Sequence, residues 1–457
     1  MQNAPKKIVV VGLGVGGFYA AKSALAANRE AEVTLIDKKD FELFSPCGMP
    51  FVIEGTVKSF EHLIHAMPEQ SKRLTKLLKH EVTDIDVKNR TVNVRNIATG
   101  EIKKLGWDSL IIDTGSKPII LPIPGAKELL NKGVFTIDCL ENAKKIDEFA
   151  NNAKKAVVVG AGAIGLEVAV ALKERGLEVV VVEKLGHPLP RILDEDIGET
   201  LKESFTKNGI KTIFRCSVER IDGSNTVESV LVNGEAIKTD LVVMAAGVKA
   251  NTDLVKNTGI KIGQFGIATT SKMETSVGDI YAVGDCAETL NLITKRPAGV
   301  HLATTAYKQG IVAGINAAGG SMEYPGSLGT FGAVIGELEV AGTGLTSESA
   351  KALGYDITVG KGKTRTRPEW MPESTDITVK IIVDASNCKI LGGQSIGGSG
   401  AASRINIISA AIRSSMNIFD MSSVELAYCP KISEMYDALS AAVDVAVKKL
   451  NAKGSFK

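Results

Sequence analysis

Two glycine-rich turns carry the clearest chemical signal in this sequence. In each, a short apolar run leads into a G-x-G-x-x-G pattern, and an acidic residue follows about twenty positions after the last glycine. The glycines and acids are, in chain order, Gly12, Gly14, Gly17 and Asp37, then Gly160, Gly162, Gly165 and Glu183. This combination is typical of a turn that binds a dinucleotide.

Each residue type has a physical role in such a turn. The first glycine permits the tight bend from strand to helix, the second lets the backbone approach a pyrophosphate, and the third lets helix and strand pack closely. The helix N-terminus then faces the phosphates, and the acidic side chain accepts hydrogen bonds from an adenosine ribose. One turn alone is a weak signal, but two complete copies predict two dinucleotides, as in a flavin–nicotinamide oxidoreductase.

The elements that must position these turns also occur twice. Apolar runs at residues 7–11 and 156–159 predict strands that enter the turns, and the stretches after the turns predict helices. A further buried strand ends at Thr114 and Gly115, and a matching one ends at Gly247. The sequence therefore predicts an internal duplication in which the motif and its closing strand repeat together.

The segments around the duplicated units are predicted from simpler patterns. Alternating runs at 80–87 and 91–94 indicate a hairpin. A short strand within 275–285 ends in Gly-Asp and precedes a long helix over 301–318.

The last third of the chain lacks a nucleotide-binding pattern. From about residue 326 it changes to alternating strands, including 378–383 and 389–394, and two amphipathic helices close it at about 402–418 and 431–450. This part is predicted to be an α+β domain.

Composition narrows the class of protein. A chain of 457 residues suggests about three domains, and 44% hydrophobic residues suffice for globular cores. The balance of 54 basic against 52 acidic residues predicts neither a nucleic-acid nor a membrane partner, and no apolar stretch approaches the length of a membrane span. The six cysteines include no CxxC pair, which favours a reducing, cytoplasmic location. The five scattered histidines predict no metal site.

These features, in this order, resemble the pyridine nucleotide-disulfide oxidoreductase family over essentially the whole chain. The resemblance implies an α/β protein with two Rossmann-like dinucleotide-binding domains and a C-terminal α+β dimerisation domain. The expected boundaries are 1–117 with 250–325 for the FAD-binding domain, 118–249 for the NAD(P)H-binding domain and 326–457 for the dimerisation domain. A homodimer is implied as well.

The resemblance also implies roles for individual residues. Asp37 belongs to the FAD site, Glu183 to the NAD(P)H site, and Asp285 of the YAxGD segment holds the flavin ribityl chain. Glu167, in the second glycine motif, sits near the nicotinamide in the family. The other cofactor-binding positions that the resemblance implies are Val82, Thr114, Gly115, Ala303 and Gly247.

Cys47 decides the branch of the family. Glutathione and lipoamide reductases carry a CxxxxC pair at this place, but here Val52 stands five residues after Cys47. The arrangement resembles the single-cysteine branch of coenzyme A disulfide reductases, NADH oxidases and NAD(P)H sulfur oxidoreductases. In that branch a lone thiol near the flavin cycles through a mixed disulfide, a sulfenic acid or a persulfide, because a thiolate is both nucleophile and leaving group. The other cysteines at 139, 216, 286 and 388 are expected to be packing residues.

The segment containing Tyr428 and Cys429 resembles a C-terminal AYxP segment that reaches the active site of the partner subunit. The resemblance makes Tyr428 a candidate proton donor. Cys429 stands where relatives commonly have a residue without a thiol, and two interpretations remain open. It is either a resolving thiol for Cys47 of the other subunit or a small residue before the turn at Pro430.

Coenzyme A recognition rests on three basic residues, Lys22, Lys72 and Arg73. Each has the alternative of being an ordinary surface charge. The segment 365–372 lacks the second tyrosine of coenzyme A reductases, which leaves room for another small disulfide, a polysulfide or an oxidant as acceptor.

The predicted function is therefore an FAD-dependent NAD(P)H oxidoreductase. It reduces a low-molecular-weight disulfide, coenzyme A disulfide or persulfide, or polysulfide through Cys47, and prefers NADH while tolerating NADPH. The alternatives are an NADH oxidase or peroxidase with a Cys47 sulfenic acid, a flavoprotein reductase that delivers electrons to a protein or quinone, and a non-enzymatic NADH sensor.

Overall fold

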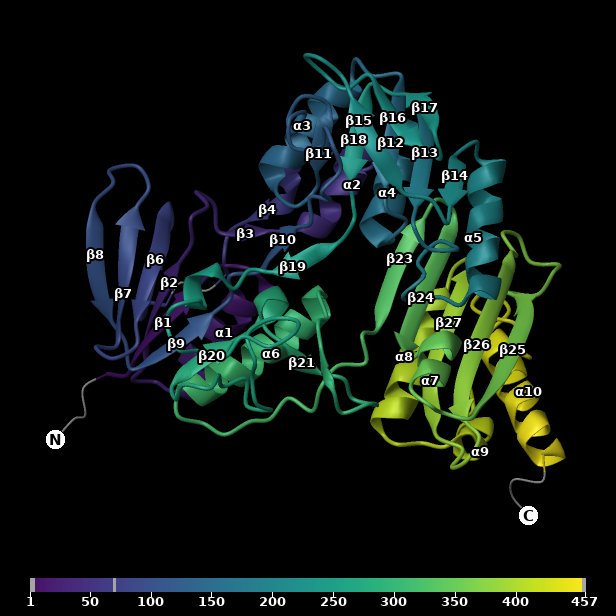
Figure 1. Cartoon of the computed structure of the whole chain (residues 1–457). Coiled ribbons are helices and arrows are strands. Elements are labelled where there is room, and N and C mark those ends of the chain that lie inside the picture. Colours follow the sequence, from purple (N-terminus) through teal and green to yellow (C-terminus); the bar gives the residue numbers. More distant parts are fainter. Residues whose placement is uncertain (1–4, 69–70, 454–457) are drawn as a thin grey trace. The chain divides into compact units, whose positions relative to one another are not determined.

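The computed structural model describes residues 5–68 and 71–453, which divide into two compact units (Figure 1). Unit 1 contains the described residues of 5–49, 57–119 and 248–327. Unit 2 contains 50–56, 120–247 and 328–453. The chain therefore passes from one unit to the other several times, and each unit is built from segments far apart in the sequence.

Unit 1 is centred on a five-stranded parallel sheet in the order β20-β9-β1-β2-β5. Its strands are β1 (Lys7–Val11), β2 (Glu32–Ile36), β5 (Leu74–Leu77), β9 (Ser109–Ile112) and β20 (Ile280–Ala282). The inner strands are almost entirely buried, as expected when helices and loops cover both faces of a parallel sheet. The short apolar runs of the sequence are these buried strands.

Helices α1 (Val15–Ala27) and α6 (Ala303–Ala317) pack against each other within unit 1. Two glycines on α6 make this close approach possible. A Cβ on Gly310 would lie 2.4 Å from the carbonyl oxygen of Gly16, and one on Gly314 would lie 2.2 Å from that of Ala20. Only residues without a side chain allow the two backbones to meet at this distance.

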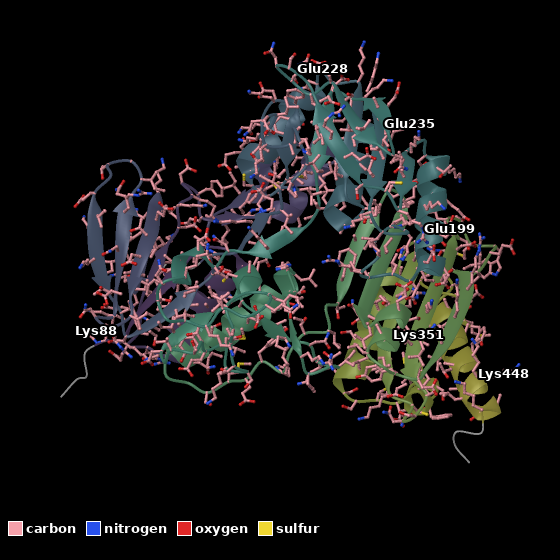
Figure 2. All side chains as sticks on the ribbon, viewed as in Figure 1. Lys88, Glu199, Glu228, Glu235, Lys351 and Lys448 are labelled. Carbon is pink, nitrogen blue, oxygen red and sulfur yellow. The ribbon has the colours of Figure 1, made fainter. Side chains whose placement is uncertain are left out.

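Unit 1 also contains the predicted hairpin. Strands β6 (His80–Asp86) and β7 (Thr91–Asn96) pair antiparallel, and β8 (Ile102–Gly106) adds a third strand that the sequence did not predict. The turn between β6 and β7 projects the exposed Lys88 away from the ribbon (Figure 2).

The first part of unit 2 repeats the architecture of unit 1. Its parallel sheet has the order β11-β18-β12-β13-β14. The strands are β11 (Val134–Thr136), β12 (Lys155–Val159), β13 (Glu178–Glu183), β14 (Lys211–Phe214) and β18 (Leu241–Met244). The helices are α3 (Leu140–Ala150), α4 (Ala163–Glu174) and α5 (Glu195–Lys207), and β15 (Val218–Asp222), β16 (Ser229–Val232) and β17 (Glu235–Lys238) form a small antiparallel sheet.

The strand registers show the duplication directly. In unit 1, Val11 of β1 pairs with Ile36 of β2 and with Ile112 of β9. In unit 2, Val159 of β12 pairs with Val182 of β13 and with Met244 of β18. The predicted internal repeat is therefore confirmed at the level of strand partners.

The second part of unit 2 is an antiparallel sheet in the order β23-β24-β27-β26-β25. Its strands are β23 (Phe331–Ile335), β24 (Leu338–Gly344), β25 (Ile357–Arg365), β26 (Asp376–Asp384) and β27 (Ile390–Gly397). Its helices are α7 (Ser347–Ala352), α8 (Ala401–Arg413), α9 (Ile418–Ser422) and α10 (Ala438–Ala452). Side chains of the sheet, α8 and α10 share one hydrophobic core.

The expected closing helices were placed too widely. The helix expected at 402–418 ends at Arg413, and α9 begins after Asn417, whose side chain and that of Asp420 form a capping box. The helix expected at 431–450 begins only at Ala438, because Asp437 caps it by accepting a hydrogen bond from the N–H of Leu439. The periodicity of apolar residues therefore extends beyond the caps that set the boundaries of these helices, which made the predicted helices too long.

A buried ionic cluster connects the two parts of unit 2. The ammonium of Lys380 on β26 lies 2.7 Å from Asp194 and 2.6 Å from Asp196, which flank the start of α5. Asp194 also accepts hydrogen bonds from the N–H and hydroxyl of Ser347, at 2.9 and 2.6 Å. Burial alone would raise the pKa of Asp194, but the bonds from Lys380 and Ser347 hold it below its ordinary value.

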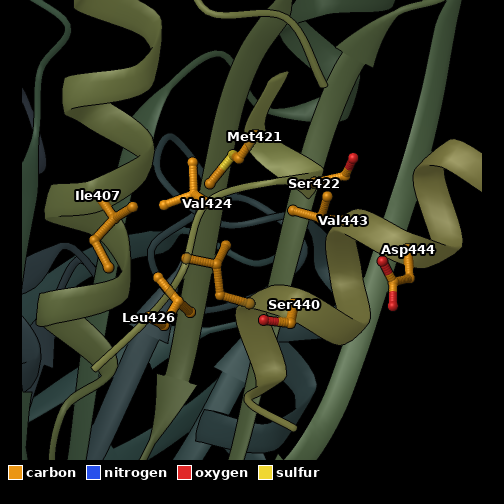
Figure 3. Close-up of a pocket in the computed structure, with 9 residues that line it drawn as sticks. Ile407, Met421, Ser422, Val424, Leu426, Ser440, Val443 and Asp444 are labelled. Atoms are coloured by element: carbon orange, nitrogen blue, oxygen red, sulfur yellow. The ribbon is translucent and has the colours of Figure 1, made fainter. Parts of the chain in front are cut away.

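A small pocket lies between α8, the segment after α9, and α10 (Figure 3). Its lining is mostly apolar, with Ile407, Met421, Val424 and Leu426 among the side chains that face it. The space inside is about 30 Å³, which holds one or two water molecules. It is therefore too small to be a substrate site.

Candidate dinucleotide and thiol sites

The first glycine turn joins β1 to α1 and admits only glycine at two places. Gly12 has a φ of +106°, and a Cβ there would lie 2.0 Å from the carbonyl oxygen of Asp113. A Cβ on Gly17 would lie 2.0 Å from the carbonyl oxygen of Gly12. Asp37 closes the turn, because its carboxylate accepts hydrogen bonds from the N–H of Leu13 at 2.6 Å and of Lys39 at 2.8 Å.

The second turn, between β12 and α4, has the same construction. Gly160 has a φ of +109°, and a Cβ on Gly165 would lie 2.1 Å from the carbonyl oxygen of Gly160. Glu183 accepts hydrogen bonds from the N–H of Ala161 at 2.7 Å and of Leu185 at 2.8 Å. In each repeat the acidic residue thus accepts two hydrogen bonds. One comes from the N–H of the residue after the first glycine, and the other from the N–H of the residue two positions after the acid itself.

Both turns fit the phosphates of a dinucleotide. Helices α1 and α4 begin after Gly14 and Gly162, and neither N-cap residue has a side chain that could cap its helix. The N–H groups of the two first turns are therefore available to an anion, except that of Gly17 in α1, which Asp113 binds at 2.6 Å. A Cβ on Gly162 would meet nothing within 4 Å, so the surface in front of α4 is open at this point.

The predicted flavin-contacting residues of unit 1 gather around the ends of its strands. Asp285 lies in the short helix η4 (Gly284–Cys286) after β20 and accepts a hydrogen bond from the hydroxyl of Ser116 at 2.9 Å. Thr114 donates its hydroxyl to the carbonyl of Asn251 at 2.7 Å, which ties β10 (Ser116–Pro118) to β19 (Val248–Ala250). Gly115 and Gly247 both have positive φ angles, so each turn after a closing strand needs glycine.

At two predicted cofactor positions, Ala303 and Val82, the backbone rather than the side chain is the group that could contact a cofactor. Ala303 is the first residue of α6, whose N-terminus no described side chain caps. Val82 on β6 buries its side chain in the core of unit 1. A contact from Val82 to a cofactor would therefore come from its backbone.

Cys47 is exposed and sits in a tight turn of unit 1. It is the central residue of the 3-10 helix η1 (Pro46–Gly48), which precedes α2 (Met49–Glu54). The N–H of Ser45 donates to the carbonyl of Leu63 at 2.9 Å, and a Cβ on Gly48 would lie 2.4 Å from the side chain of Leu63. The backbone on both sides of the thiol is thus held against η2 (Phe60–Leu63).

Four of the other cysteines have surroundings that differ from those of the exposed Cys47. Burial raises the pKa of Cys286 to about 12, and its Sγ donates to the carbonyl of Val283 at 3.1 Å. Burial raises the pKa of Cys139 to about 11. Cys388 is buried, and its pKa is also raised by burial. Cys216 accepts a hydrogen bond from the amide of Asn233 at 2.9 Å. Because their pKa values are raised, the thiols of Cys139, Cys286 and Cys388 remain protonated at neutral pH and are poor nucleophiles.

Tyr428 and Cys429 lie in unit 2, in an exposed segment before α10. The backbone turns at Cys429, whose carbonyl accepts hydrogen bonds from the N–H of Ile432 at 2.7 Å and of Ser433 at 3.0 Å. The phenol-bearing side chain of Tyr428 is 48% exposed, and Met435 is 75% exposed. Cys47 and Cys429 of one chain belong to different units.

Glu167 of α4 is a largely buried carboxyl in unit 2. Burial raises its pKa to about 7. A carboxyl that exchanges its proton near neutral pH is suited to a place beside reacting groups.

The three candidate coenzyme A ligands differ in their surroundings. Lys22 on α1 and Lys72 are exposed. The guanidinium of Arg73 donates hydrogen bonds to the carbonyls of Leu25, Asn28 and Ala31, at 3.0 to 3.1 Å. Arg73 therefore closes the C-terminal end of α1, which argues against its availability for an anionic ligand.

Asp113 is a functional candidate that sequence reasoning treated only as the end of a buried strand. It is 8% exposed and lies directly beneath the first glycine turn, where its carboxylate accepts the N–H of Gly17 at 2.6 Å. Burial, reinforced by the charges of Asp285 and Asp37, raises the pKa of Asp113 to about 8. A comparison of the two repeats in the sequence could have singled out Asp113, because the second repeat has Ala245 at the equivalent position.

Among the described residues, none of the helices is both long and apolar enough to cross a membrane. The same part of the chain contains no group of three or more histidine, cysteine, aspartate or glutamate side chains arranged to hold a metal ion.

Comparisons with known proteins cover nearly all of the chain. Residues 6–310 match the family model described as pyridine nucleotide-disulphide oxidoreductase, and residues 330–440 match the dimerisation domain of the same family. A protein named NADH oxidase from Methanocaldococcus jannaschii is 38% identical over 452 residues, which are 98% of this chain and 100% of that protein.

Two further similarities involve sulfur chemistry. A protein named CoA-dependent NAD(P)H sulfur oxidoreductase from Pyrococcus furiosus is 34% identical over 440 residues, covering 95% of this chain and 97% of that protein. The solved structure of an NAD-dependent persulfide reductase from A. fulgidus superposes with a TM-score of 0.93 at 31% identity, covering 98% of this chain and 84% of that one.

Proposed function

This chain belongs to the pyridine nucleotide-disulphide oxidoreductase family, and from that premise we propose that it reduces a sulfur–sulfur bond of a small acceptor through Cys47. The family resemblance and the fold class predicted from the sequence are confirmed. The protein is an oxidoreductase that uses FAD and NAD(P)H. The acceptor, the roles of individual residues and the domain boundaries at 117, 249 and 325 remain our proposals.

The exposure of Cys47 is the observation that carries the proposal. In unit 1 the other cysteine, Cys286, is buried with its thiol donating to a carbonyl, and its pKa is raised to about 12. Cys47 instead lies on the surface of a tight turn whose neighbours are anchored to η2. A thiol that must attack a soluble acceptor needs this access.

When bound, FAD would accept a hydride from NAD(P)H and pass on the electron pair. The thiolate of Cys47 attacks an acceptor RS–SR′, which forms a Cys47–S–S–R bond and releases R′S⁻. Two electrons then cleave that bond, which returns the Cys47 thiolate and releases RS⁻. The sum is NAD(P)H + H⁺ + RSSR′ → NAD(P)⁺ + RSH + R′SH, and a persulfide or polysulfide enters in the same way.

Other residues take supporting roles in this proposal. Tyr428 donates a proton to the leaving thiolate in the partner subunit's site, because a phenol on an exposed segment can reach outside its own chain. The match of residues 330–440 to a dimerisation domain supports the homodimer that this arrangement needs. Glu167 adjusts the surroundings of the nicotinamide. Lys22 and Lys72 are the candidates for binding the phosphates of coenzyme A.

The proposed nicotinamide preference is for NADH. Glu183 presents a carboxylate at the end of β13, where it accepts the ribose hydroxyls of NAD and repels the 2′-phosphate of NADP. Lys184 stands next to it and offsets part of that repulsion. A kcat/KM higher for NADPH than for NADH would contradict this assignment.

An anaerobic acceptor screen tests the proposed function. The enzyme is reduced with one equivalent of NADH, and its reoxidation by coenzyme A disulfide, polysulfide, hydrogen peroxide and oxygen is followed in separate stopped-flow experiments. Cys47→Ser should retain FAD and be reduced by NADH, yet lose more than about 1,000-fold in the rate of reoxidation by disulfide or polysulfide, since its nucleophile is gone. Cys216→Ser is the control and should behave as wild type.

The alternative function is an NADH oxidase, which the name of the Methanocaldococcus jannaschii relative favours. In that case Cys47 is oxidised by peroxide to a sulfenic acid, which two electrons and two protons return to the thiol with release of water. Reoxidation that is fast with oxygen or peroxide and slow with every sulfur compound would replace our proposal with this one. Wild-type rates in Cys47→Ser with all acceptors would contradict both.

A further inference from the structure

The carboxyl of Asp113 is enclosed by the first glycine turn. Its Oδ2 accepts the N–H of Gly17 at 2.6 Å. A Cβ on Gly14 would lie 2.9 Å from Oδ2, and a Cβ on Gly16 or Gly284 would lie 2.8 or 2.5 Å from Oδ1. The carboxyl thus fills the space that these four glycines leave open.

The second repeat shows that the fold of the turn does not need this carboxyl. The registers place Asp113 one residue after Ile112, which pairs with Val11, and Ala245 one residue after Met244, which pairs with Val159. Ala245 contacts its own turn in the same way, since a Cβ on Gly160 would lie 2.5 Å from its carbonyl oxygen. A methyl group is therefore sufficient beneath a glycine turn of this shape.

The charges around Asp113 make its ionised form unfavourable. Asp37 from the end of β2 and Asp285 from η4 both add negative charge, and Cys286 of η4 is a buried, protonated thiol. Lys39 is the cation on this side: its ammonium is bound to the carbonyl of Leu13 at 2.8 Å and lies 3.6 Å from the carboxylate of Asp37, so it offsets part of the charge of Asp37 and leaves that of Asp285. A dinucleotide pyrophosphate at the N-terminus of α1 would add two more negative charges.

We propose that Asp113 is a positioning residue of the FAD site that keeps its proton when FAD is bound, so that FAD binding becomes dependent on pH. As a neutral acid, Asp113 can accept the N–H of Gly17 without adding a charge to those of the phosphates. Ionised, it would repel them through the same turn. The proposal rests on FAD occupying the first turn and is independent of the electron acceptor.

The direction of the pH dependence follows from linkage. The pKa of Asp113 is raised to about 8 by burial and by its acidic neighbours, and the pyrophosphate raises it further. At a pH between the pKa of Asp113 in the free protein and its higher pKa in the FAD complex, one proton is taken up when FAD binds. The Kd for FAD should therefore be constant below about pH 8 and rise about tenfold per pH unit above it.

The test titrates FAD into apoprotein prepared from the holoenzyme, from pH 6 to 10, with flavin fluorescence as the readout. Asp113→Asn, a neutral isostere, should bind FAD within about threefold of wild type at pH 6.5 and show no rise in Kd above pH 8. Asp113→Ala reproduces the second repeat and should share that flat profile. Asp84→Asn removes an exposed carboxylate on β6 and should keep the wild-type profile.

Calorimetry on the wild type keeps the test independent of the variants. Titrations in buffers with different ionisation enthalpies should show almost no proton uptake at pH 6.5 and close to one proton per FAD near pH 9. A flat wild-type Kd, equal slopes in wild type and Asp113→Asn, or no proton uptake at pH 9 would each overturn the proposal. Failure of the wild type to bind FAD at pH 6.5 would instead contradict the cofactor assignment itself.

Discussion

Replacing Lys380 by methionine should destabilise unit 2 strongly, because it removes the cation from the buried cluster that connects its two parts. The side chain of Lys380 is 8% exposed and that of Asp194 is 6% exposed, so the two charges are paired away from water. Methionine keeps the apolar stem of the lysine in place. The substitution therefore tests the charge rather than the packing.

The magnitude follows from the burial of each partner. Removing one member of a buried ion pair costs about 3–5 kcal/mol, because the other charge is left without compensation. Asp196 is 46% exposed, so its bond to Lys380 adds at most about 1 kcal/mol. Ser347 still donates two hydrogen bonds to Asp194 in the variant. We therefore expect the free energy of unfolding to fall by an amount near the lower end of this range, about 3 kcal/mol at pH 7.5.

Urea unfolding followed by far-UV circular dichroism measures this loss. Lys361→Met is the matched control, because Lys361 lies 2.9 Å from Asp196 but is 43% exposed and does not contact Asp194 in the described structure. Its cost should stay below about 1 kcal/mol. A loss below 1 kcal/mol for Lys380→Met, or equal losses in the two variants, would refute the reasoning.

The same pair predicts a dependence on pH. The pKa of Asp194 is held below its ordinary value, so its contribution to stability is present above about pH 4 and is lost as the pH falls through the folded pKa. In Lys380→Met, burial without the cation raises that pKa. Protonation of Asp194 then relieves the penalty, and the difference between variant and wild type should shrink between pH 7 and pH 5.

The remaining predictions concern the cofactor and thiol sites. Gly165→Ala should prevent folding of the second turn, since its Cβ would lie 2.1 Å from a carbonyl oxygen, whereas Gly162→Ala should fold normally and raise the KM for NADH at least tenfold by placing a methyl group where the phosphates bind. Circular dichroism and steady-state kinetics separate these outcomes, and equal behaviour of the two variants would contradict the assignment. Glu167→Gln should be more stable than wild type at pH 8 but not at pH 4, because the carboxyl's raised pKa of about 7 makes its ionisation unfavourable in the fold. Thermal unfolding at both pH values decides this. Cys429→Ala should lower turnover with polysulfide at least tenfold if Cys429 is a resolving thiol. Unchanged turnover would make it a packing residue.

The parts of the fold that could be predicted are those with a regular local sequence pattern. The buried strands β1 and β12, their glycine turns and the hairpin of β6 and β7 follow from periodicity and glycine spacing. The ends of α8 and α10 did not, because apolar periodicity continues past Arg413 and begins before Ala438. Those boundaries depend on caps that only become decisive once the chain is folded.

The candidate site divides in a similar way. The glycines and acids of both turns were predicted from spacing alone, and the structure brings them together in two turns of the same construction. The surroundings of Arg73 could not be predicted, because a basic residue in the sequence does not reveal that the carbonyls of Leu25, Asn28 and Ala31, in and just after α1, accept its hydrogen bonds. Asp113 was overlooked because an acid at the end of a buried strand acquires meaning only from the turn that covers it.

The two acidic residues that close the glycine turns constrain how nucleotide preference can evolve. Glu183, which we propose recognises the ribose, also accepts hydrogen bonds from the N–H groups of Ala161 and Leu185 and so stabilises its own turn. A direct change to a basic residue that favours NADPH would leave both N–H groups without that acceptor. Glutamine would remove the charge while keeping one acceptor oxygen, so Glu183→Gln should weaken the preference for NADH with less disturbance of the turn than a basic residue would cause. Nicotinamide preference and the geometry of this turn are thus coupled through one side chain.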